Sequence, residues 1–171
     1  MRTSQRFQKQ VLLTLLVFFL IPLAEVQSQV VQSSMEQLAK ESDAVVVGRV
    51  AGLTSEWNES KTRIQTRVTI SIDQNVKGDA SVKSMTVLVP GGEVDGVGEV
   101  YSHAPRFLSD ESVVVFAKKN SSGTYQVSNG NQGKYTLLKD EVSSRLSVAG
   151  GKSLEEFTAS IKTALQIQET K

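Results

Sequence analysis

His103 is the one histidine in this 171-residue chain, and it is therefore the sole imidazole for acid–base or metal chemistry. Together with a serine and a carboxylate it would complete a hydrolytic triad. No serine, however, stands in the Gly-x-Ser-x-Gly elbow of the α/β-hydrolases. A loop histidine that hydrogen-bonds locally beside Ala104 and Pro105 is the competing interpretation. We therefore predict no catalytic residues and a protein that is not an enzyme.

Acidic residues gather on a glycine-rich stretch that follows a predicted strand. Any two of Glu93, Asp95, Glu99 and Asp110 can meet in space, so a small hydrolase with paired carboxylates stays an alternative. The first three also offer hard oxygens on flexible backbone, as Ca²⁺ requires, but without EF-hand spacing. A solvated loop is the simpler interpretation. We predict no cofactor and no metal, with Glu93, Asp95 and Glu99 as the candidate calcium ligands if one is bound.

Two further features favour binding over catalysis. Trp57 places a large apolar ring in a polar stretch, where it either contacts a sugar or a protein or folds back over the barrel edge. Pro90-Gly91-Gly92 either lets a ligand approach the backbone or simply ends a strand. The candidate partner-binding residues are Trp57, Pro90, Gly91, Gly92, His103, Pro105, Arg106 and Phe107.

The strongest structural signal in the sequence is the alternation between Arg63 and Ile72. It places Ile64, Val68 and Ile70 on one side and polar residues on the other, which is the pattern of a half-buried strand. Further strands are predicted at residues 44–53, 83–89, 112–117, 124–127 and 133–138, and the valine density of the first indicates burial on both faces. Gly48 inside it marks a bulge.

Turns and helices complete the predicted architecture. Residues 54–61 join two strands, Asn129-Gly130 carries a strong hairpin signal, and residues 93–105 form a long loop with a short strand at 98–101 as an option. Capping-box patterns begin at Ser33 and Ser153. Leu154, Phe157, Ile161 and Leu165 then line one face of a final helix that packs on the sheet or plugs a barrel end.

These elements predict a mainly β fold: a small antiparallel OB-like barrel of five or six strands, with a short N-terminal helix and a C-terminal helix. The predicted division is a signal peptide (1–28), a lead-in and short helix (29–42), the β-barrel domain (43–138), and a linker with the C-terminal helix (139–171).

The first residues predict export. Basic Arg2, Arg6 and Lys9 precede an apolar run at 11–21 that is too short to span a bilayer, and small residues follow, with cleavage between Ala24 and Ser28. Removing residues 1–28 takes away these three bases and one acid, a net of +2, so the charge of +1 becomes −1. We therefore expect neither nucleic acid nor a membrane as partner, and no membrane span after signal cleavage.

Cysteine is absent, which excludes disulfides, thiolate metal sites and a lipid-bearing cysteine. A secreted animal domain of this size usually contains disulfides, so the composition favours a bacterial source and a periplasmic or extracellular location. The domain must then depend on its apolar core for stability. The predicted function is an exported binding or interaction module for a protein or polysaccharide partner.

The sequence also resembles a known family. Residues 43–50, Val76-Lys77-Gly78 and 113–116 resemble the OB-like barrel of the netrin-like and tissue-inhibitor-of-metalloproteinase domains, over about 43–138. Pro90-Gly91-Gly92, Pro105-x-Phe107 and Gly133-Lys134-Tyr135 are similar to a group of uncharacterised exported bacterial proteins. The resemblance implies an OB-like barrel and a binding role, with a protease-inhibitor-like module as an alternative. The inhibitors reach the protease metal through an amino-terminal cysteine, which this chain lacks.

Overall fold

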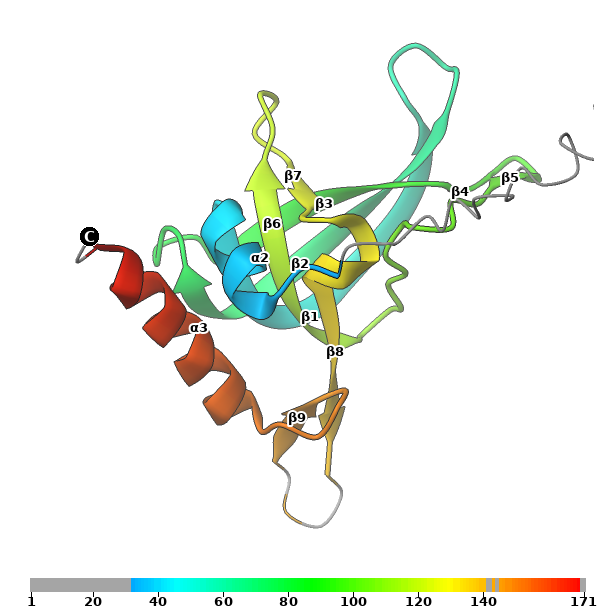
Figure 1. The fold of residues 1–171 in the computed structure, drawn as a ribbon. Coiled ribbons are helices and arrows are strands. Elements are labelled where there is room, and N and C mark those ends of the chain that lie inside the picture. Colours follow the sequence, from blue (N-terminus) through cyan, green and yellow to red (C-terminus); the bar gives the residue numbers. More distant parts are fainter. Residues whose placement is uncertain (1–31, 141–142, 144, 170–171) are drawn as a thin grey trace, which may run out of the picture. The chain divides into compact units, whose positions relative to one another are not determined.

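The computed structural model describes residues 32–140, 143 and 145–169 (Figure 1). The predicted signal peptide and its cleavage positions lie outside the described residues. Among the described residues, no helix has the length and apolar character needed to cross a bilayer.

A closed five-stranded barrel forms the centre of the fold. Its strands are β1 (Ala44–Trp57), β2 (Ile64–Lys77), β3 (Ser84–Pro90), β6 (Ser112–Lys119) and β7 (Tyr125–Val127). They pair in the order β1-β2-β3-β7-β6, and β6 returns to β1 to close the barrel. The pairings are antiparallel except for β3 with β7, which run parallel where Val87 meets Tyr125. The predicted OB-like barrel is confirmed, but it is mixed rather than purely antiparallel.

Further elements extend the barrel. Strands β8 (Lys134–Lys139) and β9 (Leu146–Val148) continue the sheet from β6, and β4 (Gly92–Val94) with β5 (Val97–Glu99) forms a separate hairpin. The helices are α2 (Met35–Glu41), the 3-10 turn η1 (Gly130–Gly133) and α3 (Leu154–Glu169). In Figure 1, α2 and α3 lie next to each other at one side of the barrel, as their mutual contacts require.

The alternation in β2 works as predicted. Ile64, Val68, Ile70 and Ile72 are all buried, and the last three belong to the cluster that fills the barrel interior with residues of β1, β3 and β6. Burying each such side chain stabilises the fold by roughly 1.5–3 kcal/mol. The interior cluster is therefore the main source of stability in a chain without disulfides.

A second apolar cluster lies on the outside of the barrel. Val45 and Val47 of β1 face it, while Val46 and Val50 face the interior, so the predicted burial of β1 on both faces is confirmed. Phe116 packs there against Phe157 of α3 at 6.4 Å between ring centroids. The C-terminal helix thus packs on the sheet.

Backbone details confirm some local predictions and correct others. Gly48 lies at a register shift between β1 and β2, and a Cβ there would come within 2.2 Å of the Ser71 carbonyl oxygen. The Ser153–Glu156 capping box is present, with both reciprocal hydrogen bonds at 3.2 Å. The first helix, however, is capped by Ser34, which accepts from the Gln37 amide, and not by Ser33.

Three connections differ from the prediction. Strand β1 continues to Trp57, so only residues 58–63 join it to β2. The stretch 93–105 contains the optional short strand, as β5, but it is not a plain loop, because β4 pairs with β5 in a hairpin with Asp95-Gly96 at its tip. Asn129-Gly130 does not make a hairpin: it opens η1, and both β7 and β8 pair with β6 rather than with each other.

Candidate functional site

The candidate site centres on the segment from Tyr101 to Pro105, which lies beside Pro90 at one mouth of the barrel. Two open grooves flank this segment, and both are lined by Val89, Pro90, Tyr101, Ala104 and Pro105. Pro90 and Pro105, both predicted to bind a partner, line both grooves. Of the other predicted residues, His103 lines the first groove, and the second groove is lined by Gly91, Gly92, Arg106 and Phe107. The fold thus brings together every predicted binding residue except Trp57.

The turn Pro90-Gly91-Gly92 fixes one end of this region by close packing. The Gly91 amide donates to the Ile64 carbonyl oxygen at 2.9 Å, and the Gly91 carbonyl accepts from the Thr66 hydroxyl at 2.7 Å. Gly92 has φ +135°, and a Cβ there would lie 2.4 Å from Ser55 Oγ. These glycines are therefore required by the protein's own packing, as expected for a strand-ending turn.

The turn η1 fixes the other end. The His103 carbonyl oxygen accepts from the Asn131 amide at 3.0 Å, and a Cβ on Gly130 would lie 2.4 Å from that same oxygen. Within the segment, the Ala104 amide donates to the Tyr101 carbonyl, and Pro105 is buried. The segment between the grooves is thus held by its own turn hydrogen bond and by the contact of His103 with η1.

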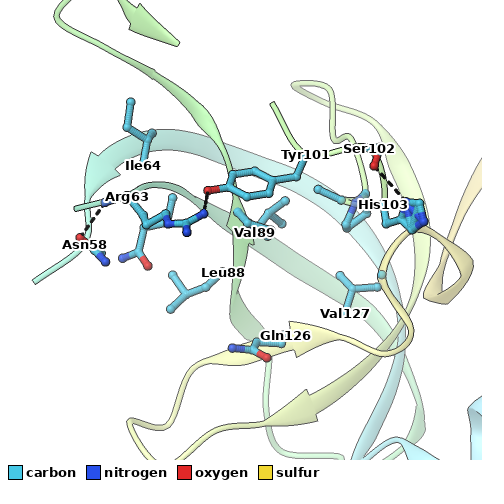
Figure 2. A pocket seen from close by; sticks show the side chains of 15 residues that line it. Asn58, Arg63, Ile64, Leu88, Val89, Tyr101, Ser102, His103, Gln126 and Val127 are labelled. Carbon is cyan, nitrogen blue, oxygen red and sulfur yellow. Dashed lines mark hydrogen bonds between the residues drawn. The ribbon is translucent and has the colours of Figure 1, made fainter. Parts of the chain in front are cut away.

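The first groove has a volume of about 620 Å³, within the usual range of small-ligand sites. Its apolar part comes from β2, β3 and β7 and includes Leu88, Val89 and Val127 (Figure 2). Its polar side chains are Asn58, Arg63, Gln65, Tyr101, Ser102, His103 and Gln126. Of these only His103 was predicted as a site residue, because the others come together only when the turn before β2, the segment after β5 and β7 are assembled.

Arg63 and Tyr101 face one another across the rim of the first groove. Arg63 Nη1 donates to the Tyr101 hydroxyl at 2.7 Å (Figure 2), and that hydroxyl in turn donates to Glu99 Oε2 at 2.9 Å. The hydrogen bond to Tyr101 holds the pKa of the Arg63 guanidinium above its ordinary value. This chain of contacts orients Arg63 while leaving it exposed to solvent.

Ser102 and His103 also line the first groove. Ser102 Oγ lies 3.1 Å from His103 Nδ1, and both side chains are exposed. In the described residues no carboxylate contacts the imidazole, so the pair lacks the third member of a hydrolytic triad.

The second groove, of about 540 Å³, lies between the β4–β5 hairpin and residues 106–108. Its rim carries three exposed apolar side chains, since Val100 is 80 %, Leu108 68 % and Leu53 38 % exposed. Apolar side chains that gather in this way are a common feature of contact surfaces. Glu93 and Glu99 also line it.

The candidate calcium ligands are spread along the β4–β5 hairpin. Glu93 pairs with Gly98 and Glu99 with Gly92, while Asp95 lies at the tip. Across the residues that the structure describes, no three acidic or histidine side chains gather closely enough to hold a metal ion.

Behind the second groove lies an ion pair that the sequence did not reveal. Lys134 Nζ contacts Glu111 Oε1, and the Thr136 hydroxyl donates to the same carboxylate at 2.6 Å. The Leu108 amide donates to the other carboxylate oxygen at 3.0 Å. Burial by itself raises the pKa of Glu111, but Lys134, Thr136 and the Leu108 amide together hold that pKa below its ordinary value. The pair thereby ties the segment that follows Phe107 to β8.

Trp57 lies apart from both grooves. It is the last residue of β1, it pairs with Ile64, and 36 % of it is exposed. Because it lines neither groove, any contact that it makes with a partner is separate from the site described above.

Comparisons with known proteins add no family to this description. No family model matches the chain, and no curated protein matches it. The chain is accordingly described as a small five-stranded mixed β-barrel domain with flanking helices.

Proposed function

We propose that this protein is an exported, non-catalytic module that binds a protein or polysaccharide partner. The contact is made by residues 90–107 and the adjacent barrel mouth. The single observation that carries the proposal is the pair of grooves on either side of the Tyr101–Pro105 segment, which is held to η1 by a hydrogen bond to the His103 carbonyl oxygen. A surface that is already fixed loses less conformational entropy on binding than a mobile loop does.

Other features support a binding role. The strand order of the barrel is the order of OB-like folds, which bind oligosaccharides and oligonucleotides at a barrel face. The balanced charge disfavours nucleic acid, so a sugar chain or a protein is the preferred partner. The resemblance to netrin-like domains points the same way. Fold alone does not decide function, and the proposal depends on the grooves.

Capture of partners from the native exported fraction tests the proposal. The immobilised protein is compared with a double variant, His103→Ala with Arg106→Ala, whose side chains are both exposed and line different grooves. The control carries Lys83→Ala and Lys162→Ala, which are exposed and line neither groove. We expect the loop variant to lose a partner that the control retains. Equal capture by the loop variant and the control would contradict the proposal.

A protease-inhibitor-like module is the second candidate. The observation that favours it is the β4–β5 hairpin, whose two strands form a sheet of their own and which is followed by the exposed Val100. An exposed strand edge with an apolar side chain is a surface that can enter a protease cleft. The purified protein would then inhibit a co-exported protease, and replacing Val100 by Asp would weaken the inhibition. No effect on such proteases at high concentration would count against this candidate.

A further inference from the structure

We infer that the first groove binds an acidic oligosaccharide, a chain of uronic acid units, with the Arg63 guanidinium on a sugar carboxylate. This inference rests on the proposed binding role of the same site. Three observations carry it: the groove is positively charged, one polar side chain in it has no hydrogen-bond partner among the described residues, and the exposed edge of β3 ends in a proline.

The charge of the groove favours an anion. Among the described residues that line it are one arginine, Arg63, and one histidine, His103, but no aspartate or glutamate. Two acids lie just outside the groove: Glu99 accepts from the Tyr101 hydroxyl, and Glu56 accepts from Gln65 Nε2. Arg63 therefore presents a positive charge to the groove in a protein whose overall charge is close to zero. A guanidinium held in place by Tyr101 is well suited to a carboxylate.

The remaining polar side chains of the groove differ in what they can offer a ligand. Asn58 Oδ1 already accepts from the Thr62 and Arg63 amides, so Asn58 serves the turn. Gln65 Nε2 donates to Glu56. Gln126, in contrast, is exposed and makes no side-chain hydrogen bond within the described part of the chain.

An amide such as that of Gln126 can donate and accept at once, which suits the hydroxyl groups of a sugar. Figure 2 shows Gln126 at the β7 side of the groove and Arg63 beyond Leu88. The apolar side chains of Leu88, Val89 and Val127 lie with them and can contact the carbon–hydrogen face of a sugar ring. The groove therefore combines one fixed cation, one available amide and apolar surface.

The edge of β3 disfavours the rival occupant, an extended peptide. Beyond Val87, which pairs with Tyr125, β3 continues to Pro90 without a further strand partner on that side. A peptide strand would have to add along this edge, but Pro90 has no N–H to donate. Proline at an edge is a common means of preventing strand addition. A sugar chain needs no such ladder of backbone hydrogen bonds.

Isothermal titration calorimetry with tetragalacturonate tests the inference on the purified protein at low salt. The comparison ligand is the neutral tetragalactose chain of the same linkage. We expect the neutral chain to bind about tenfold more weakly, and Arg63→Gln to weaken tetragalacturonate binding by about the same factor, as the loss of a charged hydrogen bond predicts. Lys61→Gln removes a charge from the same turn at a residue outside the groove, and we expect its affinity to stay within about twofold of the wild type.

Several results would overturn the inference. Equal affinity for the acidic and neutral chains would show that charge plays no role. A loss of affinity in Lys61→Gln as large as that in Arg63→Gln would show that the effect is not specific to the groove. Binding of hexaglutamate as tightly as tetragalacturonate, with the same dependence on Arg63, would replace the sugar by an acidic peptide. If tetragalacturonate does not bind while the His103 and Arg106 variant still loses its exported partner, the inference fails and the proposed function stands. If neither effect is seen, both fail.

Discussion

Replacing Glu111 by Gln removes the carboxylate from the buried pair with Lys134 and keeps the size of the side chain. In the folded protein the Lys134 side chain is 11 % and the Glu111 side chain 9 % exposed, so water can replace the lost partner only in part. Removing one partner of a buried pair costs about 3–5 kcal/mol. Because Lys134 keeps its hydrogen bond to Thr136 at 2.9 Å, we expect a somewhat smaller loss of about 2–3 kcal/mol in the free energy of unfolding.

Urea denaturation followed by far-ultraviolet circular dichroism at pH 7 measures this loss. Glu59→Gln is the matched control, since Glu59 is an exposed acid in the turn between β1 and β2 and should change the unfolding free energy by less than about 0.5 kcal/mol. A double variant, Glu111→Gln with Lys134→Met, removes both charges. It should be more stable than Glu111→Gln alone, because no uncompensated ammonium is left in the interior.

The pH dependence gives a second, independent reading. The pKa of Glu111 is lower in the folded protein than in the unfolded chain, where a glutamate titrates near about 4.3. The ionised carboxylate therefore stabilises the folded state above that pH, and this contribution is lost as the pH falls through the folded pKa. The difference in the free energy of unfolding between the wild type and Glu111→Gln should therefore become smaller as the pH falls. If the two proteins were equally stable at pH 7, or if the difference in their unfolding free energies grew toward acid pH, the reasoning would be refuted.

Three further predictions follow from the fold. Ile70→Asp, at a fully buried position in the barrel interior, should unfold the domain, whereas Thr69→Lys on the other face should leave resistance to proteolysis nearly unchanged. Gly92→Ala should cost about 1–3 kcal/mol because of its positive φ and the crowded Cβ position, while Gly98→Ala should cost less than half as much, both measured by thermal unfolding. Tyr101→Phe should preserve the fold but weaken tetragalacturonate binding by roughly threefold in calorimetry, because the guanidinium beside it loses its orienting partner.

Regular periodicity made most of the barrel predictable from the sequence. The alternating residues of β2 and the valine run of β1 report directly on which side chains are buried, since burial and period are coupled in a strand. The capping box at Ser153 has the same local character. The parallel pairing of β3 with β7, in contrast, consists of one residue pair, Val87 with Tyr125, and no local sequence pattern encodes it.

The two dipeptides with a strong hairpin signal show where local reasoning succeeds and fails. Asp95-Gly96 has positive φ at both residues and links two paired strands, so this turn could have been found by the rule that was applied only to Asn129-Gly130. Asn129 and Gly130 also have positive φ, yet they lead into η1. The signal identifies left-handed backbone correctly in both cases, but what that backbone connects is decided by tertiary contacts.

The contact between Gly130 and His103 explains why the site was only partly predictable. Strands β7 and β8 follow one another along β6, with Val127 opposite Ala117 and Lys134 opposite Val115, and η1 occupies the interval between them. There Gly130 leaves room for the His103 carbonyl, which brings the Tyr101–Pro105 segment to the place where β3 and β7 part. The predicted residues of that segment were recognisable by type. Arg63 reaches the same groove from the turn before β2 and Gln126 from β7, so only the closed barrel makes them part of one surface.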